Sequence, residues 1–258
     1  MFYLLTSLLK PRNFPYTNTL PHIKQKRLRE LKNIWSLIKT GSVKTEKRNP
    51  LQMLFFIAKM LLILVLFKII SIGLIFFLNS LGLYELPINL NRARFESFTN
   101  VEVLLLLSVY GPIMEELTFR LPLKFSKWNL TIASIGITAT ICRVLVQLEY
   151  KYSITLSIGI GIAIYYILNK KLLENISEFW IKNKLLIFYV LLIIFSFLHL
   201  KNYDMTFELL LFSPIFMLTH ILGGIFFSYV RLNSGILLAI CFHSFNNGII
   251  KIIKIIME

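Results

Sequence analysis

Long apolar segments dominate this chain and restrict it to folds that place helices in a lipid bilayer. A run of roughly 17 to 25 apolar residues crosses a hydrocarbon core about 30 Å thick as a helix. We therefore predict an all-α, polytopic integral membrane helix bundle with about seven transmembrane helices, within a range of about six to eight. The candidate segments are residues 51–79, 100–123, 130–147, 153–168, 185–203, 208–230 and 234–256.

Basic residues are concentrated before the first of these segments. The chain has a formal net charge of +15, and residues 1–50 carry much of this excess. No aromatic-interleaved motif or nucleic-acid module accompanies the basic residues, so we expect no nucleic acid partner. Attraction to anionic lipid head groups explains the pattern better. We predict a basic cytoplasmic N-terminal region over 1–50, with a helix on the membrane surface at 23–38, and a transmembrane domain over 51–258.

The distribution of lysine and arginine between the segments predicts an orientation. With the N-terminal region in the cytoplasm, the loops that contain Lys124, Lys170, Lys184 and Arg231 all fall on the cytoplasmic side, and the intervening loops are nearly neutral. We therefore expect a multi-pass protein of the cell membrane, in the cytoplasmic membrane of a bacterium.

Ionisable side chains inside an apolar segment are costly and mark functional sites. The segment 100–123 contains Glu115, Glu116 and Arg120. Neighbouring helical residues point about 100° apart, so the two glutamates face different partners. Glu116 and Arg120 share one face and can form an ion pair, which leaves Glu115 free to take a proton from water. A purely structural network at the membrane boundary explains these residues about equally well.

Two further segments each carry two motif residues spaced by one helical turn. Phe195 and His199 share a helix face, although a lone histidine near a helix end is more often interfacial than catalytic. His243 and Asn247 lie inside the last segment, where two polar groups on one buried face are costly without a shared partner. They can donate hydrogen bonds to a developing oxyanion. The three sets together predict hydrolysis inside the membrane.

The motifs E-E-x-x-x-R, F-x-x-x-H and H-x-x-x-N, in this order, resemble those of the CPBP family. This family comprises the type II CAAX prenyl endopeptidases and the bacteriocin-processing proteins, and is also known as the Abi family. The resemblance covers roughly residues 100 to 250, and the ordered triple in a polytopic chain is fairly specific. It implies an intramembrane glutamate-type endopeptidase.

Carried over to this chain, the resemblance implies that Glu115 and His199 activate the attacking water. His243 and Asn247 bind the oxyanion in the same scheme. Glu116 and Arg120 position the other groups.

The resemblance also raises the question of a metal. The family was long described as metalloproteases, and Glu115, His199 and His243 offer a carboxylate and two imidazoles of the kind that hold zinc. The H-E-x-x-H pair typical of zinc peptidases does not occur in the sequence. We therefore expect no metal and no other cofactor.

The spacing of the motifs departs from the family pattern. In typical members the second motif falls on the span that follows the first, whereas here two extra apolar segments lie between Arg120 and Phe195. Such an insertion is tolerable if it packs outside the bundle that holds the motifs. Other polar residues within apolar segments are expected to snorkel, to pair or to line a cavity; these are Lys59, Lys68, Arg143, Gln147 and His220.

We conclude that the sequence predicts an intramembrane endopeptidase that cleaves a membrane-associated protein or peptide, by CAAX-type or leader-type processing. Its partners are then this substrate and the lipid bilayer, and the sequence does not encode an oligomeric state. The alternative is a non-proteolytic membrane scaffold or immunity protein, for which the polar motifs are dispensable. A proton-coupled transporter ranks third, because the two halves of the chain show no convincing inverted repeat.

Overall fold

The structure is a computed structural model that describes residues 29–257. The start of the surface helix expected at 23–38 lies outside these residues. Within 29–257 the regular elements are helices, and one isolated bridge joins Asn89 to Tyr203. The helices before the first motif are α2 (Arg29–Thr40), α3 (Pro50–Ser80) and α4 (Asn91–Arg94). The all-helical fold is confirmed.

The first motif lies on one continuous helical path with several local geometries. Its parts are α5 (Asn100–Leu105), η1 (Leu106–Tyr110), α6 (Gly111–Glu115), η2 (Glu116–Arg120) and η3 (Leu121–Leu123). The remaining elements are α7 (Lys127–Val144), α8 (Tyr150–Ile167), α9 (Lys170–Lys182), α10 (Lys184–Phe197), η4 (Leu198–Asn202), α11 (Phe207–Phe216), α12 (Leu218–Ser234) and α13 (Ile236–Met257). All seven expected apolar segments are therefore helical.

Fewer helices than expected are long and apolar enough to span a membrane on their own. Among the described residues, Pro50–Ser80, Lys184–Asn202 and Phe207–Ser234 meet this description, and α8 with α9 forms a fourth candidate only if a 101° bend is accepted within one span. The first-motif path is divided into short elements, and α7 carries several threonines, a serine and Arg143. These features account for the segments expected at 100–123 and 130–147, and the apolar part of the last segment, Ile236–Ile252, is shorter than the helices that qualify.

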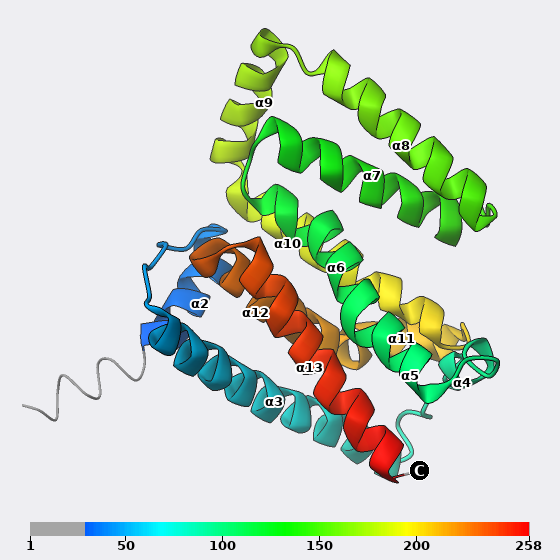
Figure 1. Cartoon of the computed structure of the whole chain (residues 1–258). Coiled ribbons are helices and arrows are strands. Elements are labelled where there is room, and N and C mark those ends of the chain that lie inside the picture. Colours follow the sequence, from blue (N-terminus) through cyan, green and yellow to red (C-terminus); the bar gives the residue numbers. More distant parts are fainter. Residues whose placement is uncertain (1–28, 258) are drawn as a thin grey trace, which may run out of the picture.

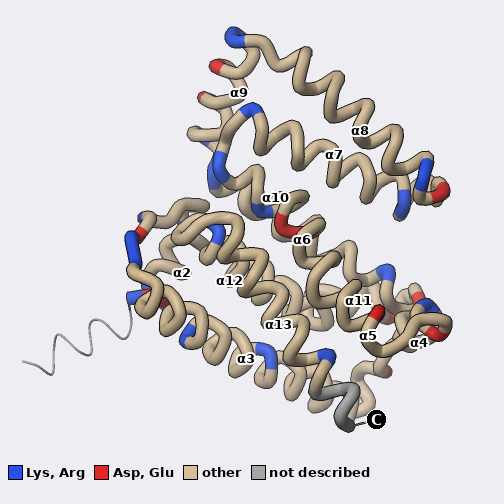
Figure 2. The backbone as a smooth tube through the Cα atoms, viewed as in Figure 1, with Lys and Arg blue, Asp and Glu red and all other residues tan. Residues whose placement is uncertain are grey.

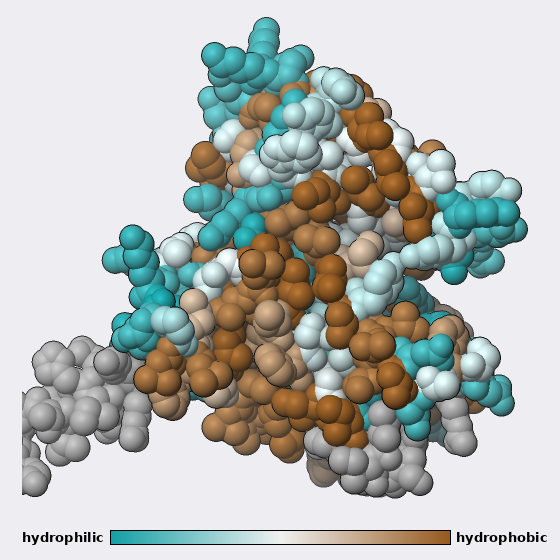
Figure 3. Space-filling view, viewed as in Figure 1, coloured by the Kyte–Doolittle hydropathy of each residue, from teal (hydrophilic) through white to brown (hydrophobic). Residues whose placement is uncertain are grey.

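The elements form a bundle with one excursion to its side (Figure 1). α3, α12 and α13 pack together with the first-motif path and α10. The hairpin α7–α8 and the crossing helix α9 lie outside this bundle, and α7 reaches it through η2 and η3. Charged residues gather near helix ends and connections (Figure 2). Apolar side chains cover the middle of the molecule in Figure 3.

Helix α2 contributes to the core of the bundle. Its Ile34 and Leu37 are buried in one cluster with residues of α3, α10 and α12, and α2 packs on α10 and α12. Glu30 accepts a hydrogen bond from Lys59 of α3 at 2.6 Å. Trp35 points outward and is 57% exposed. The inner apolar face of α2 is thus covered by protein.

Candidate active site

Two prolines distort the helical path that carries the first motif. The π-helical turns η1 and η2 end directly before the steps Gly111-Pro112 and Leu121-Pro122. A proline has no N–H, and its ring clashes with the carbonyl four residues earlier, so an α-helix cannot continue undisturbed through these positions. A π turn accommodates an additional residue, and such turns are frequent at functional sites.

Side chains donate hydrogen bonds to backbone carbonyls on this distorted path. The Gly111 N–H donates to the Leu106 carbonyl, and position 112 has no N–H. The Leu107 carbonyl therefore lacks both its α-helical and its π-helical donor, and it accepts Asn247 Nδ2 at 3.1 Å. At the other end of the path, Arg231 donates to the Arg120 and Leu121 carbonyls, each at 3.3 Å.

Glu116, Arg120 and His243 form a cluster that is almost completely shielded from solvent. The ion pair expected from the spacing is formed, with Arg120 Nε 3.7 Å from Glu116 Oε1. The same carboxylate oxygen lies 2.9 Å from His243 Nδ1. The guanidinium of Arg120 also lies over the Phe195 ring, 3.5 Å from its centroid. Glu116 therefore connects the first motif to the third, and Arg120 connects it to the second.

Glu115 points to a different set of partners, as its position one residue earlier predicts. Its Oε1 lies 3.9 Å from His199 Nε2, and its Oε2 lies 3.6 Å from His243 Nε2. Its side chain keeps 30% exposure, against none for Glu116. One carboxylate thus stays partly open between two imidazoles, while its neighbour is sealed in an ion pair.

His199 is held in place by contacts that also fix its protons. It lies on the 3₁₀ turn η4 that follows α10, and its Nδ1 is 2.9 Å from the Phe195 carbonyl. A carbonyl only accepts, so Nδ1 carries the hydrogen and the neutral ring presents a lone pair at Nε2. The His220 ring stacks on it with centroids 4.1 Å apart.

The same reasoning applies to His243. Glu116, paired with Arg120, is a carboxylate that only accepts, so His243 donates from Nδ1. In its neutral form His243 therefore also presents a lone pair at Nε2, toward Glu115. Phe227 stacks on the His243 ring with centroids 3.9 Å apart. Both imidazoles near Glu115 are oriented by a hydrogen bond on one side and by an aromatic or imidazole ring on a face.

Asn247 lies one turn beyond His243 on α13 and belongs to a separate series of hydrogen bonds. Asn246 Nδ2 donates to Asn247 Oδ1 at 2.9 Å, and Lys68 Nζ of α3 donates to Asn246 Oδ1 at 3.1 Å. Asn246 is 2% exposed. The structure thus brings Glu115, Glu116, Arg120, His199 and His243 into direct contact, and it ties Asn247 to Leu107 and Asn246.

The donor set does not converge in the way a metal ion requires. Each imidazole faces a different oxygen of Glu115. Among the residues that the structure describes, no three His, Cys, Asp or Glu side chains are grouped to hold a metal. Zinc ligands meet at one point about 2.0–2.3 Å from each donor, so these side chains do not fit the ion and no step is assigned to it.

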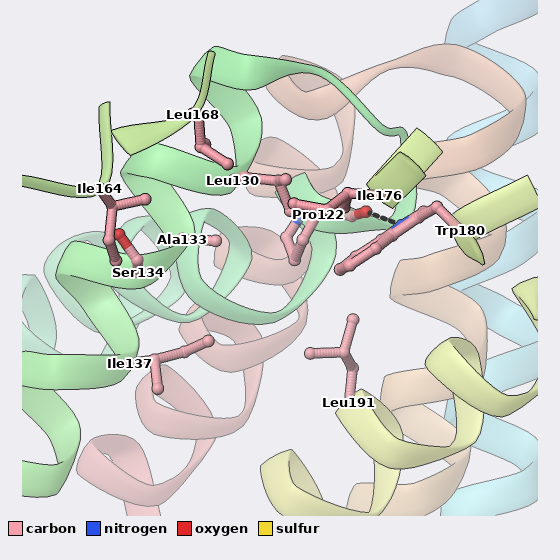
Figure 4. A pocket seen from close by; sticks show the side chains of 10 residues that line it. All are labelled: Pro122, Leu130, Ala133, Ser134, Ile137, Ile164, Leu168, Ile176, Trp180 and Leu191. Carbon is pink, nitrogen blue, oxygen red and sulfur yellow. Dashed lines mark hydrogen bonds between the residues drawn. The ribbon is translucent and has the colours of Figure 1, made fainter. Parts of the chain in front are cut away.

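An open apolar pocket of about 310 Å³ lies between the insertion and the bundle (Figure 4). Pro122, Ile137, Trp180 and Leu191 are among its lining residues, and no residue of the three motifs lines it. Trp180 Nε1 donates to the Pro122 carbonyl at 2.9 Å and ties α9 to the end of the motif path. This pocket therefore lies apart from the cluster of carboxylates and imidazoles.

Sequence reasoning did not identify several residues that support the site. Asn246 and Phe227 were not singled out, and His220 and Lys68 were noted only as isolated polar residues. Arg231 was expected in a cytoplasmic loop, but it is buried within α12. A buried amide next to Asn247 and two prolines within an apolar run were the available signals. The stacking of His220 on His199 has no local signal, because the two rings come from different helices.

The fold and these contacts define a membrane protein that gathers carboxylates and imidazoles from three helical segments within its bundle. A family model described as type II CAAX prenyl endopeptidase Rce1-like matches residues 97–249, which is more than half of the chain and includes all three motifs. The chain belongs to this family. It is therefore a CAAX-type intramembrane protease that acts on a peptide or protein at the membrane. No curated protein and no solved structure matches it.

Proposed function

We propose that this protease hydrolyses a peptide bond of its substrate with a water molecule that Glu115 and His199 activate. The observation that carries the proposal is the position of the Glu115 carboxylate between the imidazoles of His199 and His243. Glu115 Oε1 and the lone pair at His199 Nε2 are both acceptors, and 3.9 Å is too long for a direct hydrogen bond but suits a bridging water. Such a water donates both protons and keeps an oxygen lone pair for attack.

The proton then follows a defined path. As the water oxygen bonds to the carbonyl carbon, its proton passes to Glu115, and the carbonyl oxygen becomes an oxyanion. Rotation of the protonated Glu115 carboxyl turns its O–H toward His243 Nε2, which lies 3.6 Å from Oε2. Transfer of this proton gives His243 a second N–H with which it stabilises the oxyanion. The spare hydrogen of Asn247 Nδ2 is the second donor. When the C–N bond breaks, the leaving amine takes the proton from His243 Nε2.

Glu116 and Arg120 maintain the orientation of these groups in this mechanism. Glu116 fixes the tautomer of His243 through Nδ1, and Arg120 balances the Glu116 charge. Both are positioning residues, because neither faces the space between Glu115 and the imidazoles.

The test replaces Glu115 with Gln in protein reconstituted in liposomes. The substrate is an internally quenched peptide ending in a C-a-a-X sequence, offered with and without a farnesyl group, and a quenched leader peptide is assayed in parallel. Glu115→Gln keeps the shape but removes the base, so we expect a loss of about 100- to 10,000-fold in kcat. Glu149→Gln is the matched control, because Glu149 is exposed and its carboxylate pairs with Lys151 at 3.3 Å, away from the three motifs.

The outcomes separate the readings. Loss of cleavage in Glu115→Gln and His199→Ala, with Tm preserved and no effect of a chelator, supports the glutamate-activated water. Loss of parent activity on chelation supports zinc instead. Equal cleavage by parent and Glu115→Gln overturns the mechanism. Cleavage of the farnesylated peptide alone assigns a prenylated substrate, and cleavage of the leader peptide alone assigns leader processing.

A further inference from the structure

We propose that Lys68 sets the direction of the Asn247 amide through Asn246, so that a lysine of α3 is a positioning residue of the site. The inference rests on the proposed role of Asn247 as an oxyanion donor. It concerns three hydrogen bonds in series, from Lys68 Nζ to Asn246, from Asn246 to Asn247, and from Asn247 to the Leu107 carbonyl. Their lengths are 3.1, 2.9 and 3.1 Å.

The chemistry of the first group determines the direction of all the others. An ammonium donates and never accepts, so Asn246 must turn its Oδ1 toward Lys68. Asn246 then has only its NH₂ group available for Asn247, so Asn247 must accept this hydrogen bond through its own Oδ1. Asn247 then has its NH₂ on the remaining side, with one hydrogen on Leu107 and the second available. Reversing any link would place two donors or two acceptors against each other.

The Leu107 end of this series of hydrogen bonds imposes the same direction. The Leu107 carbonyl is free to accept because Gly111 donates to Leu106 and Pro112 has no N–H. An acceptor at this end and a donor at the other fix both amides between them. A charged donor also polarises the hydrogen bonds that follow it, which strengthens the outward N–H of Asn247.

The course of the lysine side chain supports this role. Lys68 lies within the 31-residue apolar helix α3, where a lysine is costly unless it is paired. Its ammonium reaches Asn246, which is 2% exposed. Its stem passes Gly223 of α12, where an added Cβ would lie 3.9 Å from Lys68 Cε. The side chain is thus directed into the bundle and toward the third motif.

The decisive variants are Lys68→Met, Asn246→Asp and Asn247→Ala, assayed with the quenched farnesylated peptide in liposomes. Lys68→Met keeps the stem and removes the donor. Asn246→Asp keeps the contact with Lys68 but turns an acceptor toward Asn247, so the relay predicts that the Asn247 amide inverts. Loss of one oxyanion donor reduces kcat by about 100- to 1,000-fold, and we expect at least about a tenfold loss in kcat with unchanged KM for the two relay variants.

Lys59→Met is the matched control, since it removes a lysine from the same helix and its ion pair with Glu30 but leaves the relay intact. Lys68→Arg, which still only donates, should retain more activity than Lys68→Met. Asn246→Asp distinguishes the relay from a structural role, because a mere ion pair with Lys68 would be strengthened by the carboxylate. Where Asn247→Ala lowers kcat, parent-like kcat in Lys68→Met or in Asn246→Asp overturns the relay.

A second readout does not depend on cleavage. In protein labelled with ¹⁵N-asparagine, the Asn247 side-chain NH₂ signal is assigned by its loss in Asn247→Ala. The relay predicts that Lys68→Met shifts this signal although the hydrogen bond of Lys68 is made to Asn246, and an unmoved signal overturns the relay. Parent-like kcat in Asn247→Ala refutes the oxyanion role in the proposed function, and the NMR signal then still decides the relay.

Discussion

Replacing Arg120 with Leu should strongly destabilise the folded bundle. Arg120 is 1% exposed and Glu116 is fully buried, with 3.7 Å between the facing nitrogen and oxygen. At an effective dielectric constant of 20, unit charges at 3.7 Å attract by about 4.5 kcal/mol. Removing one partner of such a pair leaves an uncompensated charge, so we expect a loss of about 3–5 kcal/mol in the free energy of unfolding.

The experiment follows denaturant unfolding in mixed micelles, with refolding checked on dilution of the denaturant. Glu116→Gln combined with Arg120→Leu removes both charges, so it should recover part of the loss seen in Arg120→Leu alone. Arg120→Lys keeps the charge but loses the planar contact with Phe195 at 3.5 Å, and should fall between parent and Arg120→Leu. Unchanged stability in Arg120→Leu, or a double variant no more stable than the single one, would refute the reasoning.

Three further substitutions test the packing and capping of individual helices. Gly136→Ala places a Cβ against the Thr118 side chain and 3.3 Å from its Cα, so it should lower the free energy of unfolding by about 1–3 kcal/mol. In Gly159→Ala the added Cβ meets nothing within 4 Å, so this variant should be neutral or stabilised by up to about 1 kcal/mol. Equal unfolding midpoints for the two variants would contradict the contact between α7 and η2. Asn49 accepts from the Gln52 N–H at 2.8 Å in a capping box at the start of α3, so Asn49→Ala should lower stability by about 1 kcal/mol, measured by the same unfolding assay.

Much of the helical architecture could be predicted from the sequence, because apolar runs of bilayer length have few other folded forms. The expected segment 51–79 corresponds to α3 and 185–203 corresponds to α10 with η4. The break at Met217 between α11 and α12 was not predicted, although Pro214 lies just before it. Helix α9 was taken for a loop because its lysines obscured its apolar face.

The motifs indicated that side chains of the first, second and third motif lie close together, but they did not indicate which atoms are in contact. Spacing by one turn correctly paired Glu116 with Arg120, since these residues lie in one helical path. It could not reveal that both glutamates contact His243 from opposite ring nitrogens, because this depends on how α13 packs on the motif path. The distorted turns η1 and η2 also changed the register that a regular helix of 3.6 residues per turn assumes.

The side excursion α7–α9 has a consequence for how members of this family are detected. The chain leaves the bundle after Leu123 and returns at Lys184, where α10 begins, and the contacts among the motif residues do not involve α8 or α9. The number of residues between the first two motifs is therefore a poor criterion for membership of the family. Searches that fix this interval will reject chains that carry the same three motifs with a different insertion, whereas searches that require only the order of the motifs will retain them.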